Sequence, residues 1–141
     1  MLIYTADQEK IVRSEGEKAH PNECCGFLIG EVDKAGVKTV KHVQAIDNAS
    51  EGGEQYHRFL ITPEDMIKAE KTARSMKLDV IGFYHSHPDC EAVPSKYDKD
   101  HALPFYSYII VAVEQGKSKE FTCWELTPDR AEFLREEIRL S

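Results

Sequence analysis

The sequence predicts one α/β (α+β) domain over residues 1–141, and three observations support this. Short segments rich in β-branched, aromatic and other apolar residues alternate with polar or glycine-containing turns, which is typical of strands. Two other segments begin with helix-capping residues and carry apolar residues at helical spacing. The length suffices to bury one core, and no repeat, low-complexity tract or linker divides the chain.

The first third of the chain predicts a helix followed by two strands. Thr5-Ala-Asp-Gln8 has the form of a capping box and opens a helix over about residues 6–20. This helix ends near His20-Pro21, because proline disfavours helix in the residue before it. A buried strand is predicted over residues 25–31, a turn at Ala35-Gly36 and a second strand over residues 37–46.

The middle of the chain predicts a loop, a short strand and a second helix. Residues 48–54 are polar and glycine-rich, and loops of this kind often flank active sites. Residues 56–61 are strand-like. Thr62-Pro63 opens a helix that extends to about Lys77. Its apolar stripe predicts a core face, formed by Met66, Ala69, Ala73 and Met76.

The remaining segments complete the predicted sheet. Residues 78–84 form a strand, and Ser95 caps a short helix that begins before Asp98. Two more strands cover residues 106–113, the most apolar run, and residues 119–126. Residues 127–141 are ambiguous, because Thr127-Pro128 indicates a helix start whereas residues 137–140 could form a strand.

Two histidines and an aspartate form the clearest functional pattern. His85 and His87 lie at i and i+2 of a strand, so both side chains project to one face. Asp98 could add a carboxylate oxygen. Three such ligands without a fourth are typical of a catalytic zinc ion, Zn2+, which keeps an open position for water. An isolated His-x-His is a weak signal, but here it lies within His-x-His-x7-Ser-x2-Asp, which ends at Ser95 and Asp98.

This pattern resembles the JAMM motif of the MPN-domain metalloproteases of Mov34/PAD-1 type, which are zinc isopeptidases. That family also requires an upstream glutamate before a Cys-Gly and an apolar strand, and Pro21-Asn-Glu23-Cys-Cys-Gly26-Phe-Leu-Ile-Gly30 matches that element. The resemblance implies a single JAMM/MPN domain with a curved mixed β-sheet flanked by helices.

The resemblance also implies a role for each residue of the motif. His85, His87 and Asp98 would bind zinc, and the pKa of a bound water would then fall to near 7 from about 15.7 in bulk. Glu23 would act as the general acid and base without binding the metal. Ser95 would donate a hydrogen bond to the oxyanion, although its position also fits a helix cap.

The predicted substrate also follows from the resemblance. Compact JAMM proteins of this length are similar to peptidases of ubiquitin-fold sulfur-carrier proteins, which cleave after a C-terminal Gly-Gly and release, for instance, cysteine. An isopeptidase that removes ubiquitin-like modifiers from proteins remains an alternative. A non-catalytic MPN scaffold is disfavoured because the whole residue set is present. A zinc deaminase is excluded, because its His-x-Glu and Pro-Cys-x-x-Cys elements are missing.

Composition limits the partners. The formal net charge of −7 argues against non-specific nucleic-acid binding. No apolar run reaches the length of a membrane span and no signal peptide is evident, so we expect no membrane partner and a cytoplasmic location. The sequence is compatible with a homodimer.

The other cysteines and histidines carry weaker signals. The four cysteines do not have zinc-ribbon spacing, and we expect reduced, mostly buried thiols. Cys90 is the exception, because it follows His87 closely and could bind zinc or be oxidised. His57 is interpreted as an ordinary histidine, Asp100 as a false alternative to Asp98, and Trp124 as a core residue.

Overall fold

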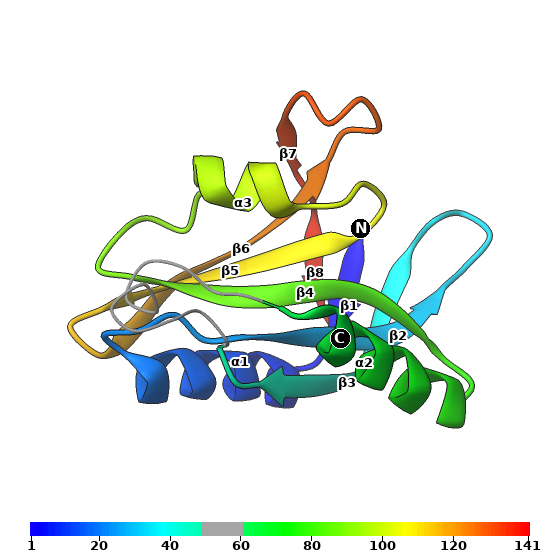
Figure 1. Cartoon of the computed structure of the whole chain (residues 1–141), viewed down its shortest axis with the longest axis horizontal. Helices are drawn as coiled ribbons and strands as arrows, with labels where there is room; N and C mark the ends of the chain where they lie inside the picture. The colour runs from blue at the N-terminus through cyan, green and yellow to red at the C-terminus, as the bar shows by residue number, and fades with distance from the viewer. Residues whose placement is uncertain (49–60) are drawn as a thin grey trace.

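The computed structural model describes residues 1–48 and 61–141, and these residues build one mixed sheet with three helices against it (Figure 1). The helices are α1 (Ala6–Ala19), α2 (Pro63–Ser75) and α3 (Lys96–His101). The strands are β1 (Leu2–Tyr4), β2 (Cys25–Val32), β3 (Lys38–Ile46), β4 (Asp79–Pro88), β5 (Ser107–Glu114), β6 (Lys117–Leu126), β7 (Phe133–Arg135) and β8 (Ile138–Leu140).

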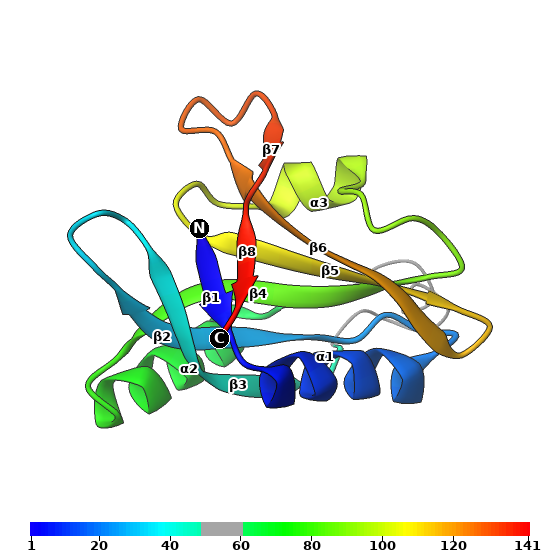
Figure 2. The same ribbon diagram turned by 180° about the vertical axis from the view of Figure 1, so that it is seen from behind.

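The eight strands follow the order β7-β6-β5-β4-β2-β3-β1-β8. Strands β4 and β5 are parallel, as are β1 with β3 and β1 with β8, whereas the other neighbours are antiparallel. The curved mixed sheet flanked by helices that the sequence predicted is therefore confirmed. In both views α3 lies beside β5 and β6 (Figures 1 and 2). Helix α1 contacts β3 to β6, and α2 contacts β2 and β4.

Capping boxes fix the start of all three described helices. The side chains of Thr5, Thr62 and Ser95 each accept a hydrogen bond from the backbone N–H of the third helical residue. The side chain of that third residue in turn accepts a hydrogen bond from the backbone N–H of the cap residue. Pro63 at the first position of α2 has no N–H to leave unpaired. These local signals explain why the helix starts could be predicted.

The sheet separates two hydrophobic clusters. One includes Val12 of α1 together with Tyr84, Ile109 and Val111 of the sheet. The other includes Ala69 of α2 and a set of aromatic and aliphatic residues, namely Phe27, Phe83, Ala102, Tyr108 and Leu126. Strand alternation assigns Phe83 and Tyr84 to different faces, so His85 and His87 lie on the Phe83 face. None of the described helices is long and apolar enough to span a membrane.

Some predicted boundaries differ from the structure. Strand β4 carries both histidines, as the motif predicted, and it ends at Pro88; the range 78–84 was too short, because β5 pairs with β4 in parallel along residues 82–88. In the ambiguous segment 127–141, Thr127-Pro128 begins a turn and not a helix, and Asp129 Oδ1 accepts hydrogen bonds there from Thr127 Oγ1 and the Ala131 N–H. Residues 138–140 form β8, which agrees with the strand alternative. Met76 is 43% exposed and does not belong to the core stripe, whereas Ala69 and Ala73 are buried.

Gly26 on β2 allows a close approach of the buried Tyr84 ring. A Cβ at position 26 would overlap the ring carbons and the hydroxyl oxygen of Tyr84. We therefore expect Gly26→Ala to lower the free energy of unfolding by about 1–3 kcal/mol, the usual cost of overpacking a core. Urea denaturation measures this effect, and Glu31→Ala at the exposed end of the same strand is the control. A Gly26→Ala protein as stable as the Glu31→Ala control would contradict this packing.

Candidate metal centre

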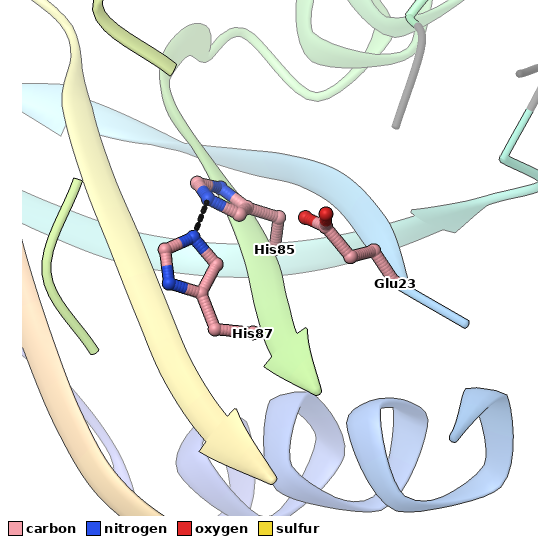
Figure 3. Close-up of side chains that lie close together, drawn as sticks. All are labelled: Glu23, His85 and His87. Atoms are coloured by element: carbon pink, nitrogen blue, oxygen red, sulfur yellow. Dashed lines mark hydrogen bonds between the residues drawn. The ribbon is translucent and has the colours of Figure 1, made fainter. Parts of the chain in front are cut away.

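The two histidines of the motif meet on one face of β4. Their side chains are buried, with 1% of His85 and 5% of His87 exposed. The two Nε2 atoms lie 3.1 Å apart (Figure 3). Nδ1 of His87 lies 2.8 Å from the Glu91 carbonyl oxygen, and this bond requires the proton on Nδ1. The His87 Nε2 lone pair is then directed at the neighbouring ligand atoms, as metal-binding histidines require.

Asp98 reaches the histidines from α3. Its Oδ2 lies 3.0 Å from His87 Nε2 and 3.2 Å from His85 Nε2. The capping box holds the carboxylate in place, because the Ser95 N–H donates to the same Oδ2 at 2.9 Å. Helix α3 thus begins at the position that brings Asp98 over β4, and Asp98 is only 8% exposed.

The three ligand atoms have the separations that a tetrahedral zinc ion requires. Zinc–nitrogen and zinc–oxygen bonds of about 2.0–2.1 Å place neighbouring ligand atoms about 3.3 Å apart in a tetrahedron. The observed separations among His85, His87 and Asp98 are 3.0, 3.1 and 3.2 Å. Two imidazoles and one carboxylate are also ligands that zinc commonly has in proteins, so the residues present fit this ion.

Burial and the contacts within the triad shift the pKa values of all three residues. Burial lowers the pKa of His85, which favours the neutral imidazole that binds metals. Burial opposes charge on Asp98 as well, but His85 and His87 hold the pKa of its carboxyl well below the usual range. Burial acts against the charged form of His87 too, but the hydrogen bond to Asp98 raises its pKa overall. An anionic oxygen therefore lies beside two imidazole nitrogens.

Glu23 completes the arrangement from the segment just before β2. Cys25, the first residue of β2, pairs with His85 in the antiparallel β2–β4 ladder, so the segment that carries Glu23 lies beside the histidines of β4. The carboxylate points toward the His85 ring (Figure 3). A carboxylate oxygen lies within 4.8 Å of ring nitrogens of both histidines, so these three residues also form a group that could hold a metal ion. The Asp98 oxygen lies closer to both nitrogens, which favours Asp98 as the third ligand.

The environment of Glu23 is unusual for a carboxylate. The residue is 5% exposed, and its Oε1 has no hydrogen-bond partner among the described residues. Burial raises its pKa to about 8, the nearby Asp98 charge adds to this, and His87 acts in the opposite direction. A buried carboxyl with an unused oxygen is suited to exchange a proton with a water molecule or a substrate amine.

Ser95 has the capping role that its position indicated. Its Oγ accepts a hydrogen bond from the Asp98 N–H at 3.1 Å. The sequence alone left open whether one hydroxyl could serve both as a cap and as a catalytic donor. The cap uses a lone pair of the oxygen and leaves the hydroxyl hydrogen to donate elsewhere, so the two roles are compatible.

An apolar cavity of about 270 Å³ opens beside the triad. Besides His85 and Asp98 it is lined by residues of α2, α3 and the sheet, among them Met66, Phe83, Leu103 and Tyr108. Tyr97 and His101 stack on its α3 side with ring centroids 4.1 Å apart. No pattern in the sequence indicated this cavity, because its walls come from segments far apart in the chain.

Cys90, Asp100 and Trp124 lie outside the metal group. Cys90 is exposed and lies in a separate acidic hollow with His20 and Asp89. Asp100 is exposed, and Trp124 is partly buried against the core. The predicted loop at 48–54, the strand at 56–61 and His57 fall almost entirely outside the described residues. Cys24, Cys25 and Cys123 are buried free thiols, as expected.

The chain belongs to the family of prokaryotic homologues of the JAB domain, whose family model matches residues 5–127. The family predicted from the motifs is therefore confirmed. This chain is similar to a desampylase of Haloferax volcanii, with 34% identity over 91 residues, which cover 64% of this chain and 62% of that protein. A desampylase of Pyrococcus furiosus is 30% identical over 105 residues, which cover 74% of this chain and 67% of that protein.

Three solved structures are similar to the fold of this chain. A solution structure of a Salinibacter ruber protein is 37% identical, with a TM-score of 0.77 over 98% of this chain and 90% of that chain. A Desulfitobacterium hafniense protein is 29% identical, with a TM-score of 0.86 over 100% and 93% of the two chains. A JAB1/MPN domain protein of Archaeoglobus fulgidus, 18% identical with a TM-score of 0.56 over 99% and 97%, shares the fold.

Proposed function

We propose that this protein is a zinc-dependent peptidase or isopeptidase that hydrolyses the amide bond after the C-terminal Gly-Gly of a ubiquitin-fold carrier protein. One observation carries the proposal. Three ligand atoms converge at 3.0–3.2 Å in a chain of the JAB family, and beside them lies the buried carboxylate of Glu23, whose Oε1 has no hydrogen-bond partner within residues 1–48 and 61–141. A non-catalytic scaffold would have no need for this arrangement of four buried polar side chains.

Each residue of the site has a distinct proposed role. His85, His87 and Asp98 hold the zinc, which when bound would lower the pKa of a water ligand and polarise the substrate carbonyl. Glu23 accepts the proton of the attacking water and returns it to the nitrogen of the leaving amine. Its Oε1 has no competing hydrogen-bond partner among the described residues, and its raised pKa suits both transfers.

Ser95 is proposed to stabilise the oxyanion. Its Oγ accepts the capping hydrogen bond from the Asp98 N–H, and the cap does not use the hydroxyl hydrogen. A hydroxyl in this position can donate to the negative oxygen that develops when water adds to the amide carbonyl. The loss of one such donor typically costs about 10²–10³ in rate.

The burial of the site supports a glycine-ended substrate. Glu23, His85, His87 and Asp98 are each at most 8% exposed, so the scissile amide has to reach a recessed centre. Glycines without Cβ enter such a site in an extended conformation that bulkier residues cannot share without a clash. The neighbouring apolar cavity of about 270 Å³ could then receive an apolar side chain from elsewhere in the carrier.

The leaving group divides the proposal into two versions. The leading version releases an amino acid such as cysteine from a sulfur-carrier protein. The second version releases a whole protein from a ubiquitin-like modifier, and the similarity to two desampylases supports it. Both versions use the same zinc chemistry and the same carrier tail.

Cleavage of a matched pair of carrier tails tests the substrate. We expect the zinc-loaded protein to cleave a carrier ending in Gly-Gly-Cys and to leave a Gly-Ala-Cys control nearly intact, because the added methyl group has no room at the recessed centre. Mass spectrometry of both products measures this. A carrier joined to a lysine side chain distinguishes the two versions. Equal cleavage of the glycine and alanine tails would contradict the proposed tail recognition and leave the zinc chemistry untouched.

A further inference from the structure

The peptide group between Glu23 and Cys24 is hydrogen-bonded on both sides by side chains from distant parts of the chain. On one side the Cys24 N–H donates to Ser86 Oγ at 2.8 Å, and this bond is buried. On the other side Asn48 Nδ2 donates to the Glu23 carbonyl oxygen at 3.1 Å. Hydrogen bonds therefore fix both the N–H and the carbonyl oxygen of the peptide group that follows the Glu23 side chain.

Ser86 occupies a position at which the regular ladder between β2 and β4 ends. The register pairs Cys25 with His85, and the Ser86 N–H still donates to the Cys24 carbonyl at 3.2 Å. In a continuing antiparallel ladder the Cys24 N–H would donate to a main-chain carbonyl of β4. Here the Ser86 hydroxyl oxygen takes that place, so the chain can leave the sheet at Glu23 and still remain attached to it.

The Ser86 side chain is itself tightly confined. The residue is fully buried, on the opposite face of β4 from its neighbours His85 and His87. A Cβ on Gly16 of α1 would lie 3.3 Å from Ser86 Cβ, so α1 closes over this position. A side chain enclosed by the helix and the sheet has little freedom to rotate, and its hydroxyl therefore fixes the Cys24 N–H firmly.

We infer that Ser86 and Asn48 are positioning residues that hold the Glu23 carboxylate over the metal ligands. This inference rests on the proposed role of Glu23. Neither residue belongs to the metal group, and both act through the Glu23–Cys24 peptide. Proton transfer requires the carboxylate within hydrogen-bond reach of the attacking water, and a displacement of about 1 Å can cost up to about 10²-fold in rate.

Ser86→Ala and Asn48→Ala, made separately, test the inference. We expect each to lower kcat about tenfold or more, with KM and zinc content unchanged, because substrate binding and the ligand triad are not altered. Asn48→Ala provides the test if the fully buried Ser86→Ala protein does not fold. The control is Ser107→Ala, which removes another fully buried hydroxyl, bonded to Lys38 and Glu136, and should leave kcat unchanged.

A second measurement is independent of activity. In the zinc-free protein, amide hydrogen exchange at Cys24 should accelerate at least tenfold in Ser86→Ala, because the N–H loses its acceptor. In the Glu23→Gln background, Ser86→Ala should cause no further fall in kcat, since the positioning acts through the Glu23 carboxylate. Unchanged kcat and unchanged exchange in Ser86→Ala, alongside an inactive Glu23→Gln protein, would overturn this inference alone. A fully active Glu23→Gln protein would instead overturn the proposed role of Glu23.

Discussion

Replacing Glu23 with glutamine should abolish nearly all turnover and leave the fold and the zinc content intact. Glutamine has almost the same shape, but its amide cannot accept the proton of the attacking water or return one to the leaving amine. The loss of a general base commonly costs about 10²–10⁴ in rate. The ligand atoms of His85, His87 and Asp98 lie 3.0–3.2 Å from one another, and Glu23 lies beside this triad without belonging to it. Zinc should therefore remain bound in the variant.

Steady-state kinetics with a Gly-Gly-Cys carrier, together with zinc analysis of each preparation, measures this effect. Glu31→Gln is the matched control, because the same change is made at the exposed end of β2, the strand that follows Glu23. Turnover by Glu23→Gln within a fewfold of the parent would show that another group is the base.

The second large effect concerns the histidines. The double variant His85→Ala/His87→Ala should lose the bound zinc, about one ion per chain in the parent, and all activity, because two of three ligands are removed. Elemental analysis after gel filtration measures the metal, and circular dichroism confirms that the variant is folded. His20→Ala/His42→Ala removes the same number of imidazoles away from the triad and should retain zinc. Full zinc retention by the His85→Ala/His87→Ala protein would refute the assignment of the ligands.

The parts of the site that depend on local geometry could be predicted from the sequence. Strand alternation is enough to place His85 and His87 on one face. The Ser95 capping box is a local signal as well, and it explains why Asp98 lies in the first turn of a short helix. The buried runs in β2 and β5 are long enough to be recognised by composition alone.

Features that depend on pairing between distant segments could not be predicted in this way. Glu23 lies just before β2, whose ladder with β4 joins residues about sixty positions apart, and only the family resemblance indicated its role. The hydrogen bonds that Ser86 and Asn48 make to the Glu23–Cys24 peptide also join segments far apart in the chain. Strands β1 and β7 have three residues each, too few to show an alternating pattern, and pairing within the sheet stabilises them.

X-ray diffraction measured on both sides of the zinc absorption edge, from crystals of the zinc-loaded protein, tests the central claim most directly. The anomalous difference should show one strong peak about 2.0–2.2 Å from His85 Nε2, His87 Nε2 and an Asp98 carboxylate oxygen, with both Glu23 oxygens outside bonding distance. A zinc ion bound by Glu23 in place of Asp98, or bound elsewhere, as at Cys90, would contradict the claim.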